Sequence, residues 1–164
     1  MLSQCPRNIF IKIDANMSLS NYYWATDMTK KIAALDVNKC IGCMECMFAC
    51  SRRVGRGGFD KSAIRVRSAG GIERGFVIVV CRACENPPCA RVCPTGALRE
   101  RKGGGVILSE DKCIGCGFCA QACIMGAIFW DGERNKPIVC KYCGECADYC
   151  VHNAIGMVEV KGEA

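Results

Sequence analysis

The stretch Cys81-Arg-Ala-Cys84-Glu-Asn-Pro-Pro-Cys89-Ala-Arg-Val-Cys93 holds four cysteines in the order C-x2-C-x4-C-x3-C. Three more copies, each reading C-x2-C-x2-C-x3-C, lie on either side of it. Motif one is Cys40, Cys43, Cys46 and Cys50; motif three is Cys113, Cys116, Cys119 and Cys123; motif four is Cys140, Cys143, Cys146 and Cys150. One repeated pattern therefore takes every cysteine except Cys5, which we expect to be an inert thiol.

The spacing within each motif is that of ligands to a cubane iron–sulfur cluster. Gaps of two residues let a tight loop place three thiolates on three irons, whereas the three-residue gap spans one helical turn and carries the fourth sulfur away. In two-cluster ferredoxins the fourth cysteine binds the other cluster, so motifs work in pairs. Four motifs predict two pairs and four [4Fe–4S] clusters. Spacing alone also allows motif one to pair with two, and three with four.

Small residues inside the motifs predict close backbone contacts to the clusters. Gly42, Gly115, Gly117 and Gly144 would let N–H groups approach the inorganic sulfides, because glycine has no side chain in the way. Such hydrogen bonds help to set the reduction potential of a cluster.

Other uses of so many cysteines fit the sequence poorly. Disulfide frameworks are typical of secreted chains, but the first ten residues show no basic segment, apolar run and cleavage site. Zinc ribbons use two CxxC pairs separated by a longer stretch, and c-type haem needs a histidine directly after CxxC. The longest apolar run, from Phe76 to Cys81, is far too short to cross a bilayer. We therefore expect a cytoplasmic chain without direct membrane insertion.

The formal charge of +6 does not indicate a nucleic-acid partner. Sixteen thiolates add about −16 and four oxidised cores about +8, so the loaded chain carries about −2. The 164 residues are 51% apolar, but this fraction includes all the cysteines, which leaves a modest core. We expect the clusters to staple the fold and the apoprotein to be largely unfolded.

The sequence offers no machinery for catalysis. It has one histidine, no GxGxxG fingerprint and no phosphate-binding GK[ST] loop. That histidine, His152, follows Cys150 by two residues and could tune a cluster by protonation, although its place in a surface turn favours a bystander role. The chain is therefore predicted to pass electrons rather than to transform a substrate.

An internal repeat extends beyond the cysteines. After motifs two, three and four, a small-residue turn leads to a strand start at Ala97-Leu98, Ala127-Ile128 and Ala154-Ile155, and Asn153 replaces glycine in the last turn. The predicted strands are Ala63–Arg67, Phe76–Val80, Val106–Leu108, Ile128–Trp130, Ile138–Val139 and Ile155–Val160. The first two are predicted to form a hairpin across Gly70-Gly71. The expected class is α+β, rich in loops.

Two segments outside the repeat are candidates for partner docking. Residues 1–35 form an N-terminal extension with Tyr22, Tyr23 and Trp24 in a row, which would serve as an interface anchor or pack on the chain itself. The insertion after motif one carries cations that would neutralise cluster charge, dock an acidic partner or remain solvated: Arg52, Arg53, Arg56, Lys61, Arg65 and Arg67.

Motif two, through Pro94-Thr95-Gly96-Ala97, resembles the signature of the four-cluster iron–sulfur subunits typified by that of dimethyl sulfoxide reductase. Cys40-Ile-Gly-Cys43 and Cys113-Ile-Gly-Cys116 resemble the first and third motifs of the same family. The resemblance covers residues 36–156. It implies tandem ferredoxin-like modules within residues 36–164, each a pseudo-twofold two-cluster unit, with an inner module at 76–130.

The resemblance also implies a nested pairing, motif two with three and motif one with four. The implied ligand sets are Cys81, Cys84, Cys89 and Cys123; Cys113, Cys116, Cys119 and Cys93; Cys40, Cys43, Cys46 and Cys150; and Cys140, Cys143, Cys146 and Cys50.

The chain departs from the usual pattern of this family in two ways, and both point to a smaller group within it. Proline follows only one fourth cysteine, Cys93, and the chain lacks long insertions. It is similar in this to the small subunits that accompany tungsten aldehyde ferredoxin oxidoreductase-type enzymes. The implied partners are a tungsten- or molybdenum-pterin catalytic subunit and a second redox partner, such as a flavin subunit or ferredoxin, in a hetero-oligomer that could repeat. The rival interpretations are a free polyferredoxin and a regulatory or maturation module.

Overall fold

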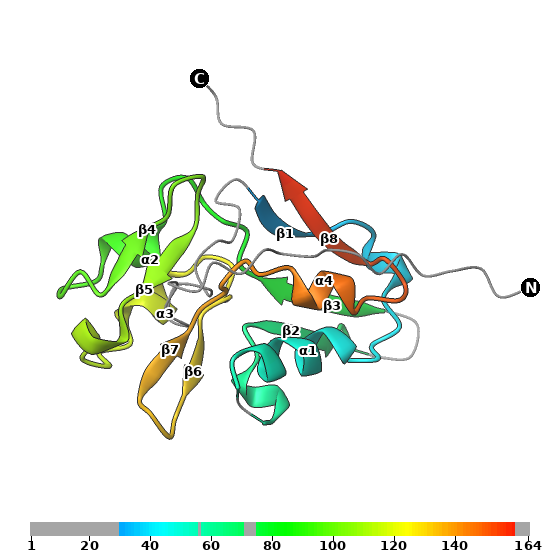
Figure 1. Cartoon of the computed structure of the whole chain (residues 1–164), viewed down its shortest axis with the longest axis horizontal. Helices are drawn as coiled ribbons and strands as arrows, with labels where there is room; N and C mark the ends of the chain where they lie inside the picture. The colour runs from blue at the N-terminus through cyan, green and yellow to red at the C-terminus, as the bar shows by residue number, and fades with distance from the viewer. Residues whose placement is uncertain (1–29, 56, 71–74, 160–164) are drawn as a thin grey trace, which may run out of the picture.

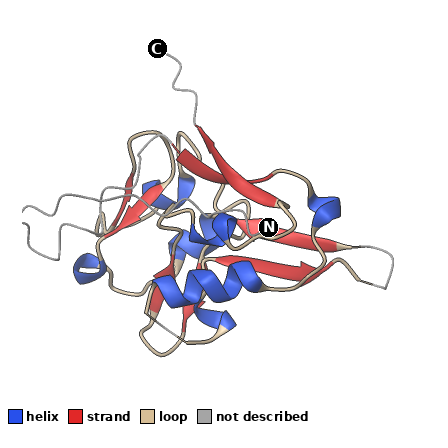
Figure 2. Cartoon of the chain, turned by 45° about the vertical axis from the view of Figure 1, so that its right-hand side comes forward, coloured by secondary structure: helices blue, strands red, loops and turns tan. Residues whose placement is uncertain are grey.

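The computed structural model describes residues 30–55, 57–70 and 75–159. The predicted aromatic anchor Tyr22-Tyr23-Trp24, the cation Arg56 and the thiol of Cys5 lie outside these residues. Within them, short helices and short strands alternate with long loops (Figure 2). The predicted class, α+β with many loops, is confirmed.

Eight strands in the described part of the chain form four separate antiparallel pairs. These are β1 (Lys30–Ala34) with β8 (Ile155–Glu159), β2 (Ile64–Ser68) with β3 (Phe76–Val80), β4 (Leu98–Glu100) with β5 (Val106–Leu108), and β6 (Phe129–Asp131) with β7 (Lys136–Ile138). All six predicted strands are present with shifts of at most two residues, and β2 and β3 form the predicted hairpin.

Strand β1 changes the predicted domain boundary. The sequence pattern placed its five residues in the N-terminal extension, but they pair with β8 from Lys30 opposite Glu159 to Ala34 opposite Ile155. Ile32, in the middle of the strand, is only 2% exposed. The folded part therefore begins earlier than residue 36. Its single buried apolar side chain gives too weak an alternation to predict a strand from sequence.

Each cysteine motif carries one short helix that begins directly before its third cysteine. The helices are α1 (Glu45–Arg53), α2 (Pro88–Arg91), α3 (Phe118–Ala122) and α4 (Glu145–Asp148). One-turn 3-10 helices are present at η2 (Val37–Lys39), η3 (Phe59–Lys61) and η4 (Glu110–Lys112). Because the fourth cysteine follows one helical turn after the third, it leaves the loop that holds the first three.

The helices pack in two pairs, which divide the molecule into two halves (Figure 1). In the outer half, α1 contacts α4, and Cys46 and Cys146 share a core with Ile32, Ile64 and Ile155. In the inner half, α2 contacts α3, and the core is Cys89, Leu98, Val106, Cys119 and Ile128. Motif one thus packs with motif four, and motif two with motif three. Strand β3, inside the predicted inner module 76–130, adds Val80 to the outer core.

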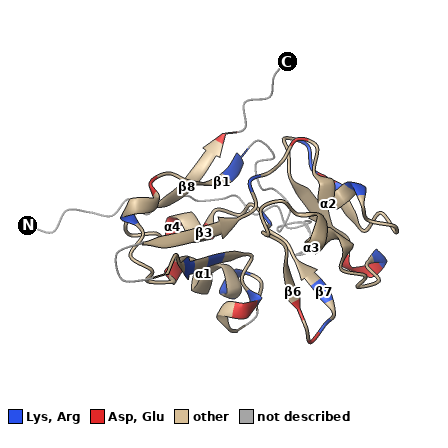
Figure 3. Cartoon of the chain, turned by 180° about the vertical axis from the view of Figure 1, so that it is seen from behind, with Lys and Arg blue, Asp and Glu red and all other residues tan. Residues whose placement is uncertain are grey.

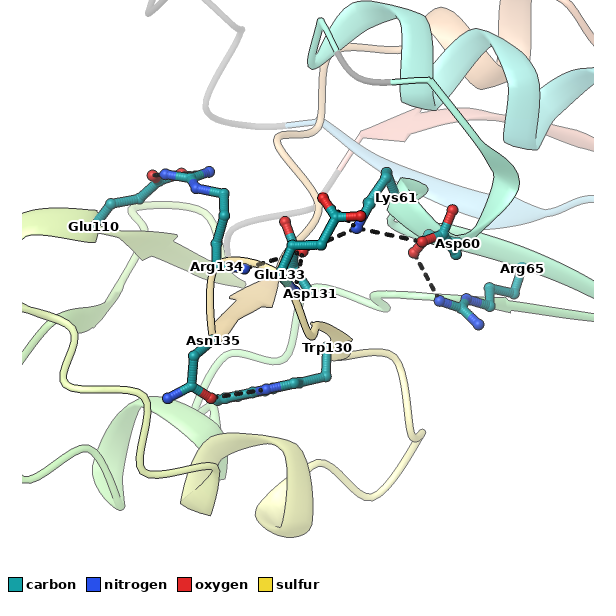
Figure 4. A network of polar contacts seen from close by, with 9 residues as sticks. All are labelled: Asp60, Lys61, Arg65, Glu110, Trp130, Asp131, Glu133, Arg134 and Asn135. Atoms are coloured by element: carbon teal, nitrogen blue, oxygen red, sulfur yellow. Dashed lines mark hydrogen bonds and ion pairs between the residues drawn. The ribbon is translucent and has the colours of Figure 1, made fainter.

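The insertion after motif one is fixed to the hairpin that precedes motif four. The ammonium of Lys61, in η3, lies 3.0 Å from the carboxylate of Asp131, in β6 (Figure 4). Lys61 is 8% and Asp131 2% exposed. The interpretation of Lys61 as a solvated or docking cation is therefore wrong, because its ammonium pairs with a buried carboxylate inside the fold. Arg65 also turns inward, with its guanidinium 4.4 Å from the Phe129 ring centroid.

Charged residues are spread over the described surface. Figure 3 shows Lys and Arg on elements of both halves, interspersed with Asp and Glu. None of the helices in the described residues is long and apolar enough to cross a membrane.

Candidate iron-sulfur centres

The third cysteine of every motif is buried, whereas the other three are half-buried or exposed. None of these sixteen cysteines forms a disulfide within the described residues. The third cysteine of each motif, at the start of a helix, is buried: Cys46, Cys89, Cys119 and Cys146. The second cysteines of motifs one and three, Cys43 and Cys116, are exposed. The third cysteine of each motif therefore belongs to one of the two cores.

Four cavities are each lined by three cysteines of one motif and by the fourth cysteine of the motif packed against it. Cavity A holds Cys93, Cys113, Cys116 and Cys119; cavity B holds Cys81, Cys84, Cys89 and Cys123; cavity C holds Cys50, Cys140, Cys143 and Cys146; and cavity D holds Cys40, Cys43, Cys46 and Cys150. The groups coincide with the ligand sets that the family resemblance implies. Cavity B is the largest, about 500 Å³, and Cys140 reaches it as well.

The fourth cysteine of every motif accepts a backbone hydrogen bond at its sulfur. The donors are Leu98 N to Cys93 at 3.5 Å, Ala127 N to Cys123 at 3.3 Å, Ala154 N to Cys150 at 3.3 Å and Ala63 N to Cys50 at 3.3 Å. Backbone donors aimed at sulfur stabilise a thiolate, which is the form that binds metal.

Burial raises the pKa of several of these thiols. It raises the pKa of Cys46 and Cys89 to about 11 and that of Cys146 to about 12, and it raises the pKa of Cys119 and Cys140. At Cys93 burial acts in the same direction, but hydrogen bonds from the Leu98 N–H and Thr95 together lower the pKa. A cationic iron core would replace the protons and favour the thiolates.

The donor set fits [4Fe–4S] clusters. Within the described residues, no three His, Cys, Asp or Glu side chains converge closely enough to bind a single metal ion. A cubane instead takes one thiolate on each of four irons, so four sulfurs spaced around a cavity suit it.

The first CxxC of every motif contains a left-handed residue directly before its second cysteine. Gly42 and Gly115 have φ of 75° and 74°, but Ala83 and Tyr142 take φ of 54° and 55° with full side chains. Of the other predicted glycines, Gly117 and Gly144 precede α3 and α4 with φ of 80° and 86°. Their contact with cluster sulfides stays a prediction. The left-handed conformation predicted for Asn153 is confirmed by its φ of 52°.

One tyrosine links the two halves. The Tyr142 hydroxyl lies 3.2 Å from the Cys81 sulfur of cavity B, and the Tyr142 N–H donates to the Cys140 sulfur of cavity C at 3.4 Å. Burial and the neighbouring Cys81 thiol raise the pKa of Tyr142. The guanidinium of Arg101 stacks on the ring, 3.9 Å from its centroid.

The predicted docking cations of motif one lie on α1. Arg52 and Arg53 are exposed, with Arg52 stacked at 5.6 Å over the Phe48 ring and Arg53 3.8 Å from Glu145 of α4. Their docking role stays a prediction. His152 lines cavity D beside Cys150.

Three residues at these centres were not predicted from the sequence: Ala63, Arg101 and Tyr142. A signal for the first was present, because Ala63-Ile64 repeats the Ala-Leu/Ile pairs that follow the other motifs, displaced by the insertion. After the insertion, Ala63-Ile64 therefore takes the place that the Ala-Leu/Ile pairs have after the other motifs. For Arg101 and Tyr142 there was no sequence signal, because only the packing of the halves brings them together.

Residues 72–159 match the family model described as a 4Fe-4S dicluster domain. A tetrathionate reductase subunit from Salmonella typhimurium is 30% identical over 79% of this chain and 56% of its own length. A probable anaerobic dimethyl sulfoxide reductase chain of Escherichia coli is 31% identical over 66% of this chain and 59% of its own. An uncharacterised ferredoxin of Methanocaldococcus jannaschii is 37% identical over 80% and 74%. This chain spans less than two thirds of either reductase chain.

Proposed function

The chain belongs to the family of 4Fe-4S dicluster domain proteins, and from this premise we propose that it is a non-catalytic electron-transfer subunit carrying four [4Fe–4S] clusters. It relays electrons between a tungsten- or molybdenum-pterin catalytic subunit, of the aldehyde oxidoreductase type, and a second redox partner such as a flavin subunit or a ferredoxin. The observation that carries the proposal is that each of four cavities is lined by three cysteines of one motif together with the fourth cysteine of the motif packed against it.

The proposed ligands of each cluster are the three cysteines of one motif and the fourth cysteine of the motif packed against it; Cys140, which also lines cavity B, is assigned to cavity C. When bound, a [4Fe–4S] cluster takes up and releases single electrons. For each cluster the chain supplies four thiolates and a backbone N–H that donates to the sulfur of the fourth cysteine of a motif. Its two apolar cores keep water from the buried thiolates. In this proposal the halves are tandem two-cluster modules, with cavities A and B in the inner half and C and D in the outer half.

Packing supports the linear order A, B, C, D for the clusters. A and B share the α2–α3 pair, C and D share the α1–α4 pair, and Cys140 belongs to C while lining B. The exposed cysteines, Cys116 and Cys43, belong to the two cavities at the ends. Electrons would therefore enter and leave through A and D.

Exposed apolar side chains surround both ends and suit partner contacts. Ile114 at cavity A is 65% exposed, and Ile41 at cavity D is 59% exposed. Phe48 and Arg52 lie on α1, which also supplies Cys46 to cavity D. We propose that this end receives one partner and the cavity A end the other.

The relatives favour a subunit of a reductase complex, since two of them are chains of tetrathionate and dimethyl sulfoxide reductases. The choice of tungsten and of an aldehyde-oxidising partner rests on the resemblance of this compact chain to the small subunits of such enzymes. We place the protein in the cytoplasm, where the reducing thiol pool keeps cysteines available as cluster ligands.

A second candidate is a free polyferredoxin that diffuses between partners. The observation in its favour is the ferredoxin relative, of which the chain covers 74%, more than of either reductase chain. A free carrier would migrate alone at the 17.8 kDa of the chain, whereas a subunit would migrate with a larger enzyme.

Metal analysis of the protein purified anaerobically from its own cells, with its partners attached, tests the proposal. We expect about sixteen irons per chain and tungsten or molybdenum in near-equal amount to the chain. Sixteen irons in a monomer without either metal would favour the polyferredoxin. An iron content well below sixteen in the intact protein would refute the four-cluster assignment.

A further inference from the structure

The two halves meet at Tyr142, the one described side chain found to hydrogen-bond a cysteine of a cavity in the other half. It lies between Cys140 and Cys143 of cavity C, yet its hydroxyl reaches Cys81 of cavity B at 3.2 Å. Its own N–H donates to the Cys140 sulfur at 3.4 Å. One residue therefore contacts proposed ligands of two successive clusters, at the step where an electron must cross between halves.

The direction of the hydroxyl hydrogen bond follows from its surroundings. The Val106 N–H donates to the Tyr142 oxygen at 3.1 Å, so this oxygen already accepts a hydrogen bond. A metal-bound thiolate has no proton to donate. The Tyr142 hydroxyl therefore donates to Cys81, which stabilises negative charge on that sulfur.

Arg101 brings a buried positive charge to the same point. It is 6% exposed and stacks 3.9 Å over the Tyr142 ring. Its Nε and Nη2 donate to the carbonyl oxygens of Gly104 and Lys30, each at 2.8 Å, and its Nη1 is buried without a hydrogen-bond partner in the described part of the chain. No carboxylate among the described residues forms an ion pair with it.

A buried cation without a carboxylate is costly unless another anion compensates it. Four thiolates around an oxidised core carry about −2, and one more electron makes this about −3. A cation stacked on the tyrosine that hydrogen-bonds Cys81 therefore favours the reduced state at cavity B. The cation also polarises the ring, which strengthens the hydroxyl as a donor.

The backbone conformation of Tyr142 is strained, and the residue opposite leaves room for its hydroxyl. Tyr142 occupies a left-handed position, with φ of 55°, where motifs one and three have glycine. Gly105 lies opposite, and a Cβ built there would collide with the Tyr142 hydroxyl. Strain of this kind persists where the surrounding structure imposes it and is common at functional sites.

We propose that Tyr142 and Arg101 are positioning residues that raise the reduction potential at cavity B and so hold the electron at the junction between the halves. The inference rests on the proposed function. In this step one electron moves from the cluster of a neighbouring cavity to that of cavity B, no bond forms or breaks, and no proton is transferred.

A redox titration of the intact protein, followed by electron paramagnetic resonance, tests the proposal in Tyr142→Phe, Arg101→Met and Arg101→Lys variants. The cavity B signal is identified as the one altered by Cys84→Ser. We expect Tyr142→Phe and Arg101→Met to reduce its equilibrium constant for reduction at least tenfold, a shift of about 59 mV to lower potential for a one-electron couple. Arg101→Lys should restore part of the shift. Arg99→Met is the matched control, because this arginine lies two residues away but is exposed.

Unchanged potentials in Tyr142→Phe, with the full iron content retained, would overturn the inference and leave the proposed function intact. This variant removes a single oxygen, so it decides the matter even if Arg101→Met fails to assemble. Equal shifts in Arg99→Met would also overturn it, because a general charge effect would then explain the result. An iron content below sixteen in the unmodified protein would instead refute the proposed function.

Discussion

The Nζ of Lys61 lies 3.0 Å from the Oδ1 of Asp131, seventy residues further along the chain. The contact joins the insertion after motif one to the β6–β7 hairpin, and so joins segments that flank different cysteine motifs (Figure 4). The hydrogen bond to Asp131 raises the pKa of Lys61, so the Lys61 ammonium stays charged through the physiological range. Asp60 and Glu133 add further carboxylate contacts at 3.4 and 3.3 Å.

Replacement of Lys61 by methionine is expected to destabilise the protein, because it leaves the buried Asp131 carboxylate without this cation. Thermal unfolding of the loaded protein, followed by loss of its visible cluster absorbance, measures the effect. Arg134→Met is the matched control, since Arg134 pairs with Glu110 at the surface and such pairs contribute about 1 kcal/mol or less. An equal fall in unfolding temperature in the two variants would show that the buried pair contributes no more to stability than the surface pair.

The nested ligand sets predict which mutations alter the same cluster. Cys123 lines cavity B with motif two, so Cys123→Ser should change the same paramagnetic signal as Cys84→Ser. Cys150→Ser should likewise change the signal altered by Cys43→Ser. If motif three instead paired with motif four, Cys123→Ser would match Cys143→Ser. Cys5→Ser serves as the control and should leave every signal unchanged.

Removal of iron should unfold most of the chain. Both cores include cysteines, and the third thiol of each motif is buried at a helix start. Without iron these positions no longer hold the loops together. We expect the far-ultraviolet circular dichroism of the anaerobically chelated, reduced protein to lose most of its helix and strand signal. A retained spectrum would show that the cores suffice without the clusters.

Gly105→Ala should be more damaging than the same change at Gly70. Both glycines are left-handed, with φ of 84° and 95°, so alanine carries a backbone penalty of about 1 kcal/mol at either site. At Gly105 the added Cβ also meets the Tyr142 hydroxyl, whereas no atom of the described residues lies within 4 Å of a Cβ at Gly70. Overpacking should add about 1–3 kcal/mol. Thermal unfolding of the two variants tests this, and equal destabilisation would contradict the contact.

Strands and turns could be predicted from the sequence where they depend on residues close together in the chain. The β2–β3 hairpin and the left-handed Asn153 follow from short patterns, because turns and alternating strands depend on nearby residues. Strand β1 was missed because its pairing with β8 joins residues more than a hundred positions apart. Lys61 was misread for the same reason, since its carboxylate partner is remote in sequence.

The sequence alone determined which residues are candidate ligands of iron–sulfur clusters, because the cysteines and the spacing between them are local features of the chain. It predicted four clusters, a loop-rich α+β chain and the absence of catalytic motifs. Only the tertiary structure decided which motifs share a cavity, how Ala63 replaces the displaced repeat, and where Arg101 and Tyr142 meet Cys81. These features depend on how two halves pack across long sequence separations, and no local pattern encodes that packing.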